Sequence, residues 1–457
     1  MCGREKVARL HRDLRCRCFV SDLAGFTSQG QPGHTIFRIS PSDGAVFNPG
    51  FSGWQPENSG IIHRRALESA PRWGYKPLIM GEIEIREIAA GSDPREFIDA
   101  SHAVFKGDSN FIAPLEMFDI KPRLDPKKNP FFKRGEAVYF VARRGGELVG
   151  RISASIDHEH NRVWKEKTGF YGFFDTIDDD AVGAVLLDRA AAWLKARGME
   201  RMSGPYGLYA NEEIGTLIEG FETPPVLMMA HSRPWQGRVT EACGLVKEKD
   251  LLAWRYEVGE FPRRAEKAWA DMMAMPELKL RSVNTSKMHD ELKIIMDIYN
   301  DAWDGKWGFV PALPDEIEKT AEDLKLIIDS DLAYIAEIDG KPMGMCILLP
   351  NMNECIRDIG GKEFPFGIVK ALWRLKVSGP KSARLMLLGI RKELRGVRKY
   401  MPLSAAMYVE VAKRASAKGY TWGELSWTRE DDSPINSGIT SMGAKIYKRY
   451  RVYTKNI

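Results

Sequence analysis

A cationic loop in the C-terminal third of the chain combines residue types that bind phosphate. Arg391, Arg395, Gly396 and Arg398 lie between an apolar run and an amphipathic stretch that starts near Pro402. A glycine lets the backbone approach an anion, arginines neutralise its charge, and the N–H groups at a helix N-terminus point toward it. The loop therefore predicts a phosphate or diphosphate site. The alternative is a basic loop that contacts only solvent.

Acidic residues form two further groups of interest. Glu430, Asp431 and Asp432 could bind an ammonium group, although polar residues before a proline are equally typical of a turn. Residues 175–183 contain four aspartates, which would repel a phosphate. We expect Asp178 to Asp180 to lie instead in the first turn of a helix, where the helix dipole favours negative charge.

Two histidines, His158 and His160, could supply metal ligands from one face of a strand. No third ligand is apparent in the sequence, and the end of a solvated hairpin is the favoured explanation of the pair. We therefore expect no metal site.

The charge distribution excludes one class of function. The chain has 457 residues, enough for two or three domains, and a net charge of +5. Residues 1–79 hold eleven Lys/Arg and six Asp/Glu, which leaves 56 of each sign in residues 80–457. The basic character belongs to the N-terminal leader, so the body of the protein is not expected to bind nucleic acid.

The leader, residues 1–79, shows no sustained helical or strand period and is interrupted by Gly and Pro. At Met80 the pattern changes to the polar/apolar alternation of a strand, so we expect the leader to be disordered or Met80 to be the true start. There is no apolar run of eighteen residues and no apolar signal core. Together with six scattered cysteines, this predicts a cytoplasmic protein.

The elements that must position these residues occur twice. Residues 139–154 and 334–349 each read as a strand, a tight turn and a second strand, with Asp339-Gly340 suited to a two-residue turn. A third strand follows in each copy, at 170–174 and 385–390. An amphipathic helix then ends in glycine, at Gly198 and Gly419.

Each copy closes with another strand, a short helix, a glycine and a last strand, with the glycines at Gly244 and Gly443. This order predicts a mixed α/β (α+β) fold of two tandem domains, each with a mixed, mostly antiparallel sheet flanked by helices. We expect the domains at 80–256 and 281–457, with residues 257–280 as a connector.

The two copies, residues 80–457, resemble the GNAT acyltransferases, and in particular their bacterial double-domain type. Bacterial ceramide synthases belong to the same superfamily. The second copy matches best, in residues 387–397, 419–427 and 441–453. The resemblance implies that acyl-CoA binds along the loop. The implied contacts are Ile390, Arg391, Arg395, Gly396, Val397 and Arg398. The acidic loop of the first copy implies a domain without cofactor.

Amide formation from a thioester needs a base for the amine and a proton donor for the leaving thiolate. Strand alternation places Glu424 and Ser426 on one face, so we expect Glu424 as the base and Ser426 as a substrate contact; the alternative is a surface carboxylate paired with Lys or Arg. The resemblance implies Tyr447 or Tyr450 as the donor. The alternative is that each tyrosine is a packing residue, which is the commoner role of a single tyrosine.

The segment 364–377 combines apolar and aromatic residues, Trp373 among them, with three cations and no acid. This composition suits a helix on an anionic membrane surface or along an acyl-chain groove. The alternative is a helix packed on the sheet with its cations extended into solvent.

The resemblance implies an acyl-CoA-dependent N-acyltransferase. The enzyme would transfer an acyl group from CoA, or from acyl carrier protein, to an amine such as a lipid or sphingoid-base amine. Peripheral contact with the inner membrane through 364–377 would fit a lipid acceptor. The alternative is a GNAT-fold binding protein that has lost its cofactor. Glu430, Asp431 and Trp373 complete the expected substrate contacts.

Overall fold

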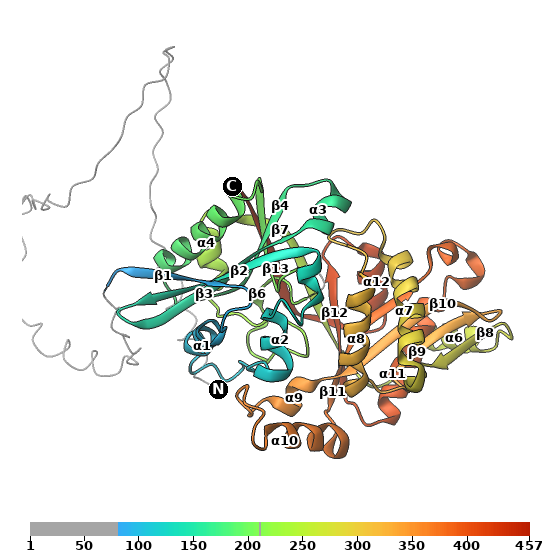
Figure 1. The fold of residues 1–457 in the computed structure, drawn as a ribbon. Helices are drawn as coiled ribbons and strands as arrows, with labels where there is room; N and C mark the ends of the chain where they lie inside the picture. The colour runs from blue at the N-terminus through green and yellow to red at the C-terminus, as the bar shows by residue number, and fades with distance from the viewer. Residues whose placement is uncertain (1–80, 210–211) are drawn as a thin grey trace, which may run out of the picture. The chain divides into compact units, whose positions relative to one another are not determined.

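Residues 81–209 and 212–457 are described by a computed structural model and belong to one compact unit of the chain (Figure 1). The predicted leader, residues 1–79, lies outside the described residues. Among the described helices, none is both long enough and apolar enough to cross a bilayer.

The first copy contributes seven strands. They are β1 (Ile83–Ala89), β2 (Gly135–Arg144), β3 (Glu147–Asp157), β4 (Thr168–Thr176), β5 (Arg201–Tyr206), β6 (Thr216–Glu219) and β7 (Val246–Glu257). Its helices are α1 (Arg95–Val104), α2 (Lys121–Leu124), α3 (His158–Trp164), α4 (Asp180–Lys195) and α5 (Gln236–Ala242), with a π turn η1 (Glu116–Ile120) and a 3-10 turn η2 (Pro130–Lys133).

The second copy contributes six strands. They are β8 (Leu278–Ser282), β9 (Ala333–Ile338), β10 (Lys341–Pro350), β11 (Ser382–Ile390), β12 (Trp422–Arg429) and β13 (Lys445–Asn456). Its helices are α6 (Arg263–Met273), α7 (Met288–Trp303), α8 (Pro314–Ile327), α9 (Met352–Ile356), α10 (Gly367–Trp373), α11 (Leu403–Ala417) and α12 (Ser433–Ser441). Shorter turns are η3 (Thr285–Lys287), η4 (Arg374–Ser378), η5 (Lys392–Leu394) and η6 (Arg398–Tyr400).

All strands join one mixed sheet, in the order β1-β2-β3-β4-β5-β13-β7-β12-β11-β10-β9-β8, with β6 also paired to β13. The last strand of each copy therefore pairs with the other copy. β13 is antiparallel to β5, and β7 is antiparallel to β12. The two exchanged strands pair with each other at the centre of the sheet, where the dark red β13 lies among strands of the first copy (Figure 1).

The predicted hairpins and helix ends are present. β2 pairs with β3 and β9 with β10, and the second turn uses Asp339 (φ 48°) and Gly340 (φ 76°), as a two-residue turn of this kind requires. The glycines after α4 and α11, Gly198 and Gly419, have φ of 79° and 84°. This left-handed conformation ends a helix with little strain only when the residue lacks a Cβ.

Apolar faces of the long helices cover the sheet. Leu186, Leu187 and Leu194 of α4 are buried in the core of the first copy, against β2, β3 and β4. In the second copy Leu403 and Met407 of α11 pack in the core formed with β10, β11 and β12. Helix α6 packs against α11. The fold prediction of mixed α/β tandem domains is confirmed.

Two regions differ from the sequence-based expectation in detail. His158 and His160 lie at the start of helix α3, not on a strand, because Asp157 accepts hydrogen bonds from the backbone of Glu159 and His160 and caps that helix. The described residues contain no cluster of three metal-ligating side chains. The range 257–280, expected to connect the copies, contains α6 and the first residues of β8.

Substituting Gly172 of β4 tests the close approach of β4 and β5. A Cβ at this position would lie 1.8 Å from the carbonyl oxygen of Tyr206, so backbone must move to admit it. We expect Gly172→Ala to lower the free energy of unfolding by at least about 1–3 kcal/mol in urea titrations. Gly423→Ala in β12 is the matched control, since its nearest contact would be 3.6 Å away. Equal stability of the two variants would contradict the predicted approach.

Candidate active site

The parallel strands β11 and β12 run together and then separate. Their pairing extends from Ser382–Trp422 to Leu385–Leu425. Beyond this point β11 continues against β10, and the last residues of β12 pair with β7. Between the diverging strand ends the backbones no longer pair with each other, and the carbonyl of Ser426 accepts from the Arg384 side chain over 3.4 Å instead.

Glu424 lies on β12 just before this point of separation. Its side chain is fully buried and accepts hydrogen bonds from the hydroxyls of Ser426 and Tyr447. Burial raises the pKa of the Glu424 carboxyl above its ordinary value of 4.5, while the charge of Arg384 opposes the shift. The structure thus combines a desolvated carboxylate with groups that stabilise its charged form.

Arg384 is the β11 residue paired in register with Glu424. Its guanidinium donates to the Ser426 hydroxyl over 3.0 Å and to the carbonyls of Leu227 and Met228 over 2.8 and 3.0 Å. These carbonyls belong to residues 220–229 of the first copy, which we call the crossover segment. The C-terminal site is therefore completed by backbone from the N-terminal copy.

Strand β13 supplies the remaining polar groups. The Tyr447 hydroxyl donates to Glu424, whereas the buried Tyr450 hydroxyl has no hydrogen-bond partner in the described part of the chain. Burial raises the pKa of both tyrosines, with a smaller contribution from the charge of Glu424. Both hydroxyls consequently stay protonated at neutral pH and can donate.

Lys448, which lies between Tyr447 and Tyr450 in the sequence, is a buried cation. Its ammonium donates to the carbonyls of Gly220 and Thr223 in the crossover segment, the latter over 2.7 Å. Burial lowers the pKa of Lys448 to about 8, against the opposing charge of Glu424. The amine therefore titrates closer to neutral pH than an exposed lysine does.

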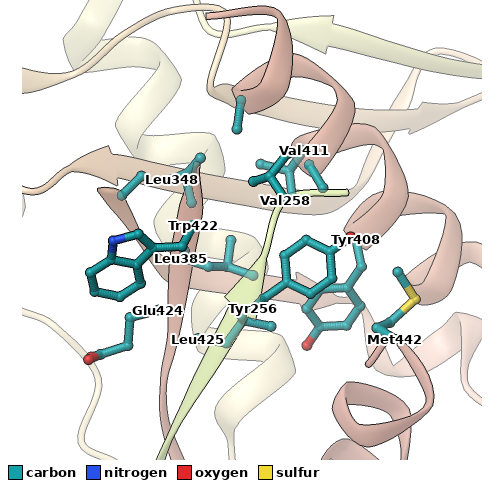
Figure 2. Close-up of a pocket in the computed structure, with 14 residues that line it drawn as sticks. Tyr256, Val258, Leu348, Leu385, Tyr408, Val411, Trp422, Glu424, Leu425 and Met442 are labelled. Carbon is teal, nitrogen blue, oxygen red and sulfur yellow. The ribbon is translucent and has the colours of Figure 1, made fainter. Parts of the chain in front are cut away.

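An apolar pocket lies between the sheet and α11 (Figure 2). It is narrow, about 40 Å³, and its wall includes Tyr256, Leu385, Tyr408, Val411 and Leu425. Trp422 and Glu424 also line it, and Figure 2 shows their side chains extending away from Tyr408 and Met442. The carboxyl group thus lies at the boundary between an apolar pocket and a polar cluster.

The predicted phosphate loop follows β11. Gly396 has φ of 82° with open space where a Cβ would lie, and Arg398 and Val397 are exposed. Arg391 is bound to Asp297 and to the carbonyl of Pro342, however, and Arg395 donates to the carbonyl of Ala302 over 2.6 Å. Arg391 and Arg395 thus hold the loop against α7, the helix that contains Asp297 and Ala302, while Arg398 extends into solvent.

The equivalent loop of the first copy is built as a helix cap. Asp179 accepts hydrogen bonds from the backbone of Ala181 and Val182 at the start of α4. Asp178 and Asp180 both pair with Arg238. Strand β5, which corresponds to β12, has the sequence RMSGPY and carries no carboxylate.

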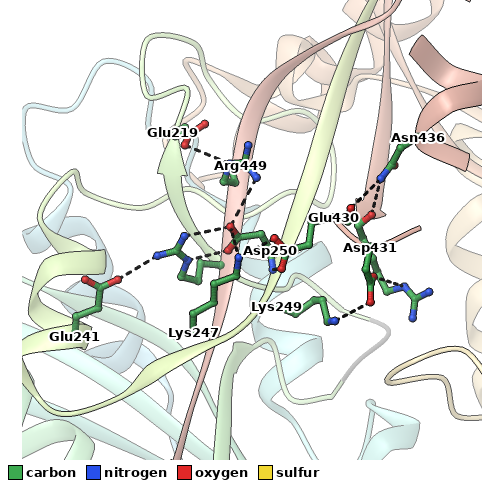
Figure 3. A network of polar contacts seen from close by, with 11 residues as sticks. Glu219, Glu241, Lys247, Lys249, Asp250, Glu430, Asp431, Asn436 and Arg449 are labelled. Atoms are coloured by element: carbon green, nitrogen blue, oxygen red, sulfur yellow. Dashed lines mark hydrogen bonds and ion pairs between the residues drawn. The ribbon is translucent and has the colours of Figure 1, made fainter. Parts of the chain in front are cut away.

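The other predicted substrate contacts lie away from Glu424. Glu430 pairs with Lys247, and Asp431 pairs with Lys249, in a network of ion pairs around Asp250 (Figure 3). Trp373 lies on α10, where 57% of it is exposed. Ile390 ends β11 at the start of the loop. Of the predicted residues, the structure brings together Glu424, Ser426 and Tyr447, with Tyr450 buried in the core beside Tyr447.

Neither Arg384 nor Lys448 was predicted from the sequence as a functional residue. Arg384 is the only charged residue in the apolar run 382–390, which is an unusual position for a cation and could have identified it. Lys448 lies among other cations in β13, and only the fold shows that it is 1% exposed.

The raised pKa of Glu424 predicts a pH-dependent stability. Below pH 4.5 the carboxyl is protonated in both the folded and unfolded chains, so its full contribution is present. As pH rises, the unfolded chain ionises first and stability falls, by about 1.4 kcal/mol per unit of pKa difference. Urea titrations should therefore show wild type losing stability relative to Glu424→Gln as pH rises from about 4.5, until the folded carboxyl also ionises.

Glu257→Gln, a change at an exposed residue of β7, is the control for this comparison. A constant stability difference between wild type and Glu424→Gln at all pH values would contradict the perturbed carboxyl.

Known proteins similar in sequence identify the family of this chain. The sequence is 38% identical over 377 residues to Protein YghO of Escherichia coli (strain K12), covering 82% of this chain and 95% of that protein. It is 37% identical over 377 residues to the bacterial ceramide synthase of Caulobacter vibrioides (strain NA1000 / CB15N), covering 82% and 97%. No family model matches the sequence.

Among solved structures, a tandem GNAT protein from the clavulanic acid biosynthesis pathway superposes with a TM-score of 0.50 at 13% identity, covering 82% of this chain and 98% of the other. This likeness confirms the tandem GNAT fold. The chain belongs to the family that includes Protein YghO and bacterial ceramide synthase.

Proposed function

We propose that this protein is an acyl-CoA-dependent N-acyltransferase that acylates a long-chain lipid amine, with its chemistry in the second copy. The observation that carries the proposal is the buried Glu424 carboxylate at the point where β11 and β12 separate. A base with a raised pKa accepts a proton more readily than an ordinary carboxylate does. The first copy offers no carboxylate on the corresponding strand β5.

The thioester supplies the activated acyl carbon. The amine nitrogen forms the new C–N bond as the C–S bond breaks, and the proton lost by the amine passes to Glu424. The departing sulfur needs a proton in turn. Tyr450 is the preferred donor, because its hydroxyl has no partner in the described chain, whereas the Tyr447 hydroxyl already donates to Glu424. Tyr447 and Ser426 then act by orienting the carboxylate.

The loop after β11 is the proposed contact for the diphosphate of the acyl donor. Its features fit such a group in part: Gly396 leaves open space on its exposed side, and Arg398 is an exposed cation next to the start of α11. Arg391 and Arg395 keep the loop in place through their bonds to Asp297 and Ala302. Arg398 is therefore the arginine with most freedom to reach an anion.

The acceptor is proposed from two observations. A relative that is 37% identical over nearly its whole length is named bacterial ceramide synthase, so a long-chain base is the favoured amine. The pocket beside Glu424 is lined by apolar and aromatic side chains, which suit an alkyl group better than a polar metabolite; at about 40 Å³ it must widen by side-chain movement to admit a long chain. Glu430 and Asp431 already pair with lysines, so they would bind an ammonium group only by exchanging those partners.

Replacing the proposed base tests the function directly. We expect Glu424→Gln to lower kcat for N-acylation of a sphingoid base by palmitoyl-CoA by about 100-fold to 10,000-fold, because the amine loses its proton acceptor. Product is measured by mass spectrometry, and palmitoyl-CoA binding by calorimetry should be unchanged. Glu257→Gln should retain activity. Full turnover by Glu424→Gln would reject Glu424 as the base.

Reversing the free charge of the loop tests the donor site. We expect Arg398→Glu to weaken palmitoyl-CoA binding by about 10-fold to 100-fold, about 1.4–2.8 kcal/mol, because a repulsive charge replaces a phosphate contact. Lys279→Glu on β8, also exposed, is the matched control. Unchanged affinity in Arg398→Glu would place the diphosphate elsewhere. If wild type binds no acyl-CoA but accepts an acyl group from acyl carrier protein, the proposed CoA dependence fails.

A further inference from the structure

We propose that the outer face of residues 364–377, which contain α10 and most of the π turn η4, is a docking surface for an anionic lipid membrane. In the described residues, sixteen large apolar side chains are exposed, and six of them lie in this one short segment. They are Phe364, Phe366, Val369, Leu372, Trp373 and Val377. We call them the apolar face. Its residues 366, 369, 373 and 377 recur at the spacing of one side of a helix.

The opposite side of this helix is already buried. Ala371 and Leu375 pack against Cys355 and Ile356 of α9, in a small core of their own. The figure shows α9 and α10 side by side (Figure 1). The helix is therefore apolar on both sides, and packing within the described chain accounts for only one of them. A solvent-facing side of a helix is ordinarily polar.

A neighbouring turn extends the apolar face. Met117 and Phe118 of η1 are also exposed, and their backbone N–H groups both donate to the Glu363 carboxylate, over 2.7 and 3.2 Å. Glu363 directly precedes Phe364 and is buried. The two copies thus contribute apolar side chains to one area of the surface, larger than the helix alone provides.

The positive charge around the apolar face indicates that its partner is anionic. Residues 357–381 hold six Lys/Arg and two Asp/Glu, although residues 80–457 as a whole are neutral. Asp358 pairs with Lys370 and Arg374, and Lys362, Lys376 and Lys381 are exposed. Exposed aromatic and aliphatic side chains bordered by cations match the interface of an anionic bilayer, where the apolar groups insert and the lysines contact headgroups.

Residues 351–381 between β10 and β11, which we call the insertion, also contact the candidate active site. Asn351 at the start of α9 accepts from the backbone of Leu227, and Asn353 donates to the carbonyl of Pro225, both in the crossover segment. Glu354 accepts from the backbone of Ser382 at the start of β11. The docking surface is therefore connected to the segment that holds Arg384. The inference rests on the proposed function only in naming membrane lipid as the source of the acceptor.

Vesicle flotation of the full chain tests the docking surface. The vesicles are phosphatidylcholine with about one third phosphatidylglycerol. We expect wild type to bind, with binding weakened by added salt, and Phe366→Ser/Val377→Ser to partition at least about tenfold more weakly. Val246→Ser/Leu326→Ser removes two equally exposed apolar side chains outside the apolar face and should bind like wild type.

Other outcomes overturn the proposal. Absence of wild-type binding, or equal binding by Phe366→Ser/Val377→Ser, would reject a membrane surface. A wild-type dimer that the same variant converts to monomer, without vesicle binding, would assign the face to a second copy of this chain.

Turnover of a short, water-soluble amine without vesicles separates this proposal from the proposed function. Phe366→Ser/Val377→Ser should retain that activity if it is folded and the proposed function holds. Vesicle binding by a wild-type protein that is inactive on every amine would reject the proposed function and leave the docking surface supported.

Discussion

The antiparallel pairing of β7 with β13 is the constraint on which the rest of the structure depends. Each strand ends one copy of the repeat and pairs with the other copy, so the two halves share one hydrogen-bonded sheet rather than a surface contact. The candidate site depends on this strand exchange, because its residues come from both copies. Tyr447 reaches Glu424 from β13, and the carbonyls that hold Arg384 come from the crossover segment of the first copy. An isolated second copy would lack those carbonyls, leaving a buried guanidinium without them, which is costly.

The polar cluster at β12 is stable because each buried charge has compensation nearby. Glu424 receives hydrogen bonds from two hydroxyls, Arg384 is satisfied mainly by main-chain carbonyls, and Lys448 is bound by two more. None of these groups forms a direct ion pair that would neutralise the carboxylate outright. Burial therefore still raises the pKa of Glu424 and lowers that of Lys448. Perturbed groups held this way are typical of a site that transfers protons.

The two copies differ in the loop before their main helix. The same position carries Asp179 as a cap in the first copy, and Gly396 and Arg398 in the second. In the proposed function the second loop therefore holds the anion, because the carboxylates of the first would repel it. The insertion between β10 and β11 adds the apolar face on its outer side and contacts the crossover segment on its inner side. In the proposed function, lipid recognition and amide chemistry are thus joined by one short insertion.

Local sequence patterns alone predicted most of the strands and helices of this protein and its tandem fold. The alternation of strands, the Asp339-Gly340 turn and the glycines after the helices predicted the elements and the tandem fold, because each depends on neighbouring residues. Strand period two also placed Glu424 and Ser426 on one face. The partners of these residues depend on contacts between distant segments. Only the tertiary structure decided that the last strands exchange, that Arg384 and Lys448 are buried beside Glu424, and that Glu430 and Asp431 pair with lysines of β7. The alternation of residues along a strand determines the face on which a side chain lies. Its burial and its hydrogen-bond partners depend on the strand that lies beside it. That neighbouring strand comes from a distant part of the sequence, and no local pattern predicts it.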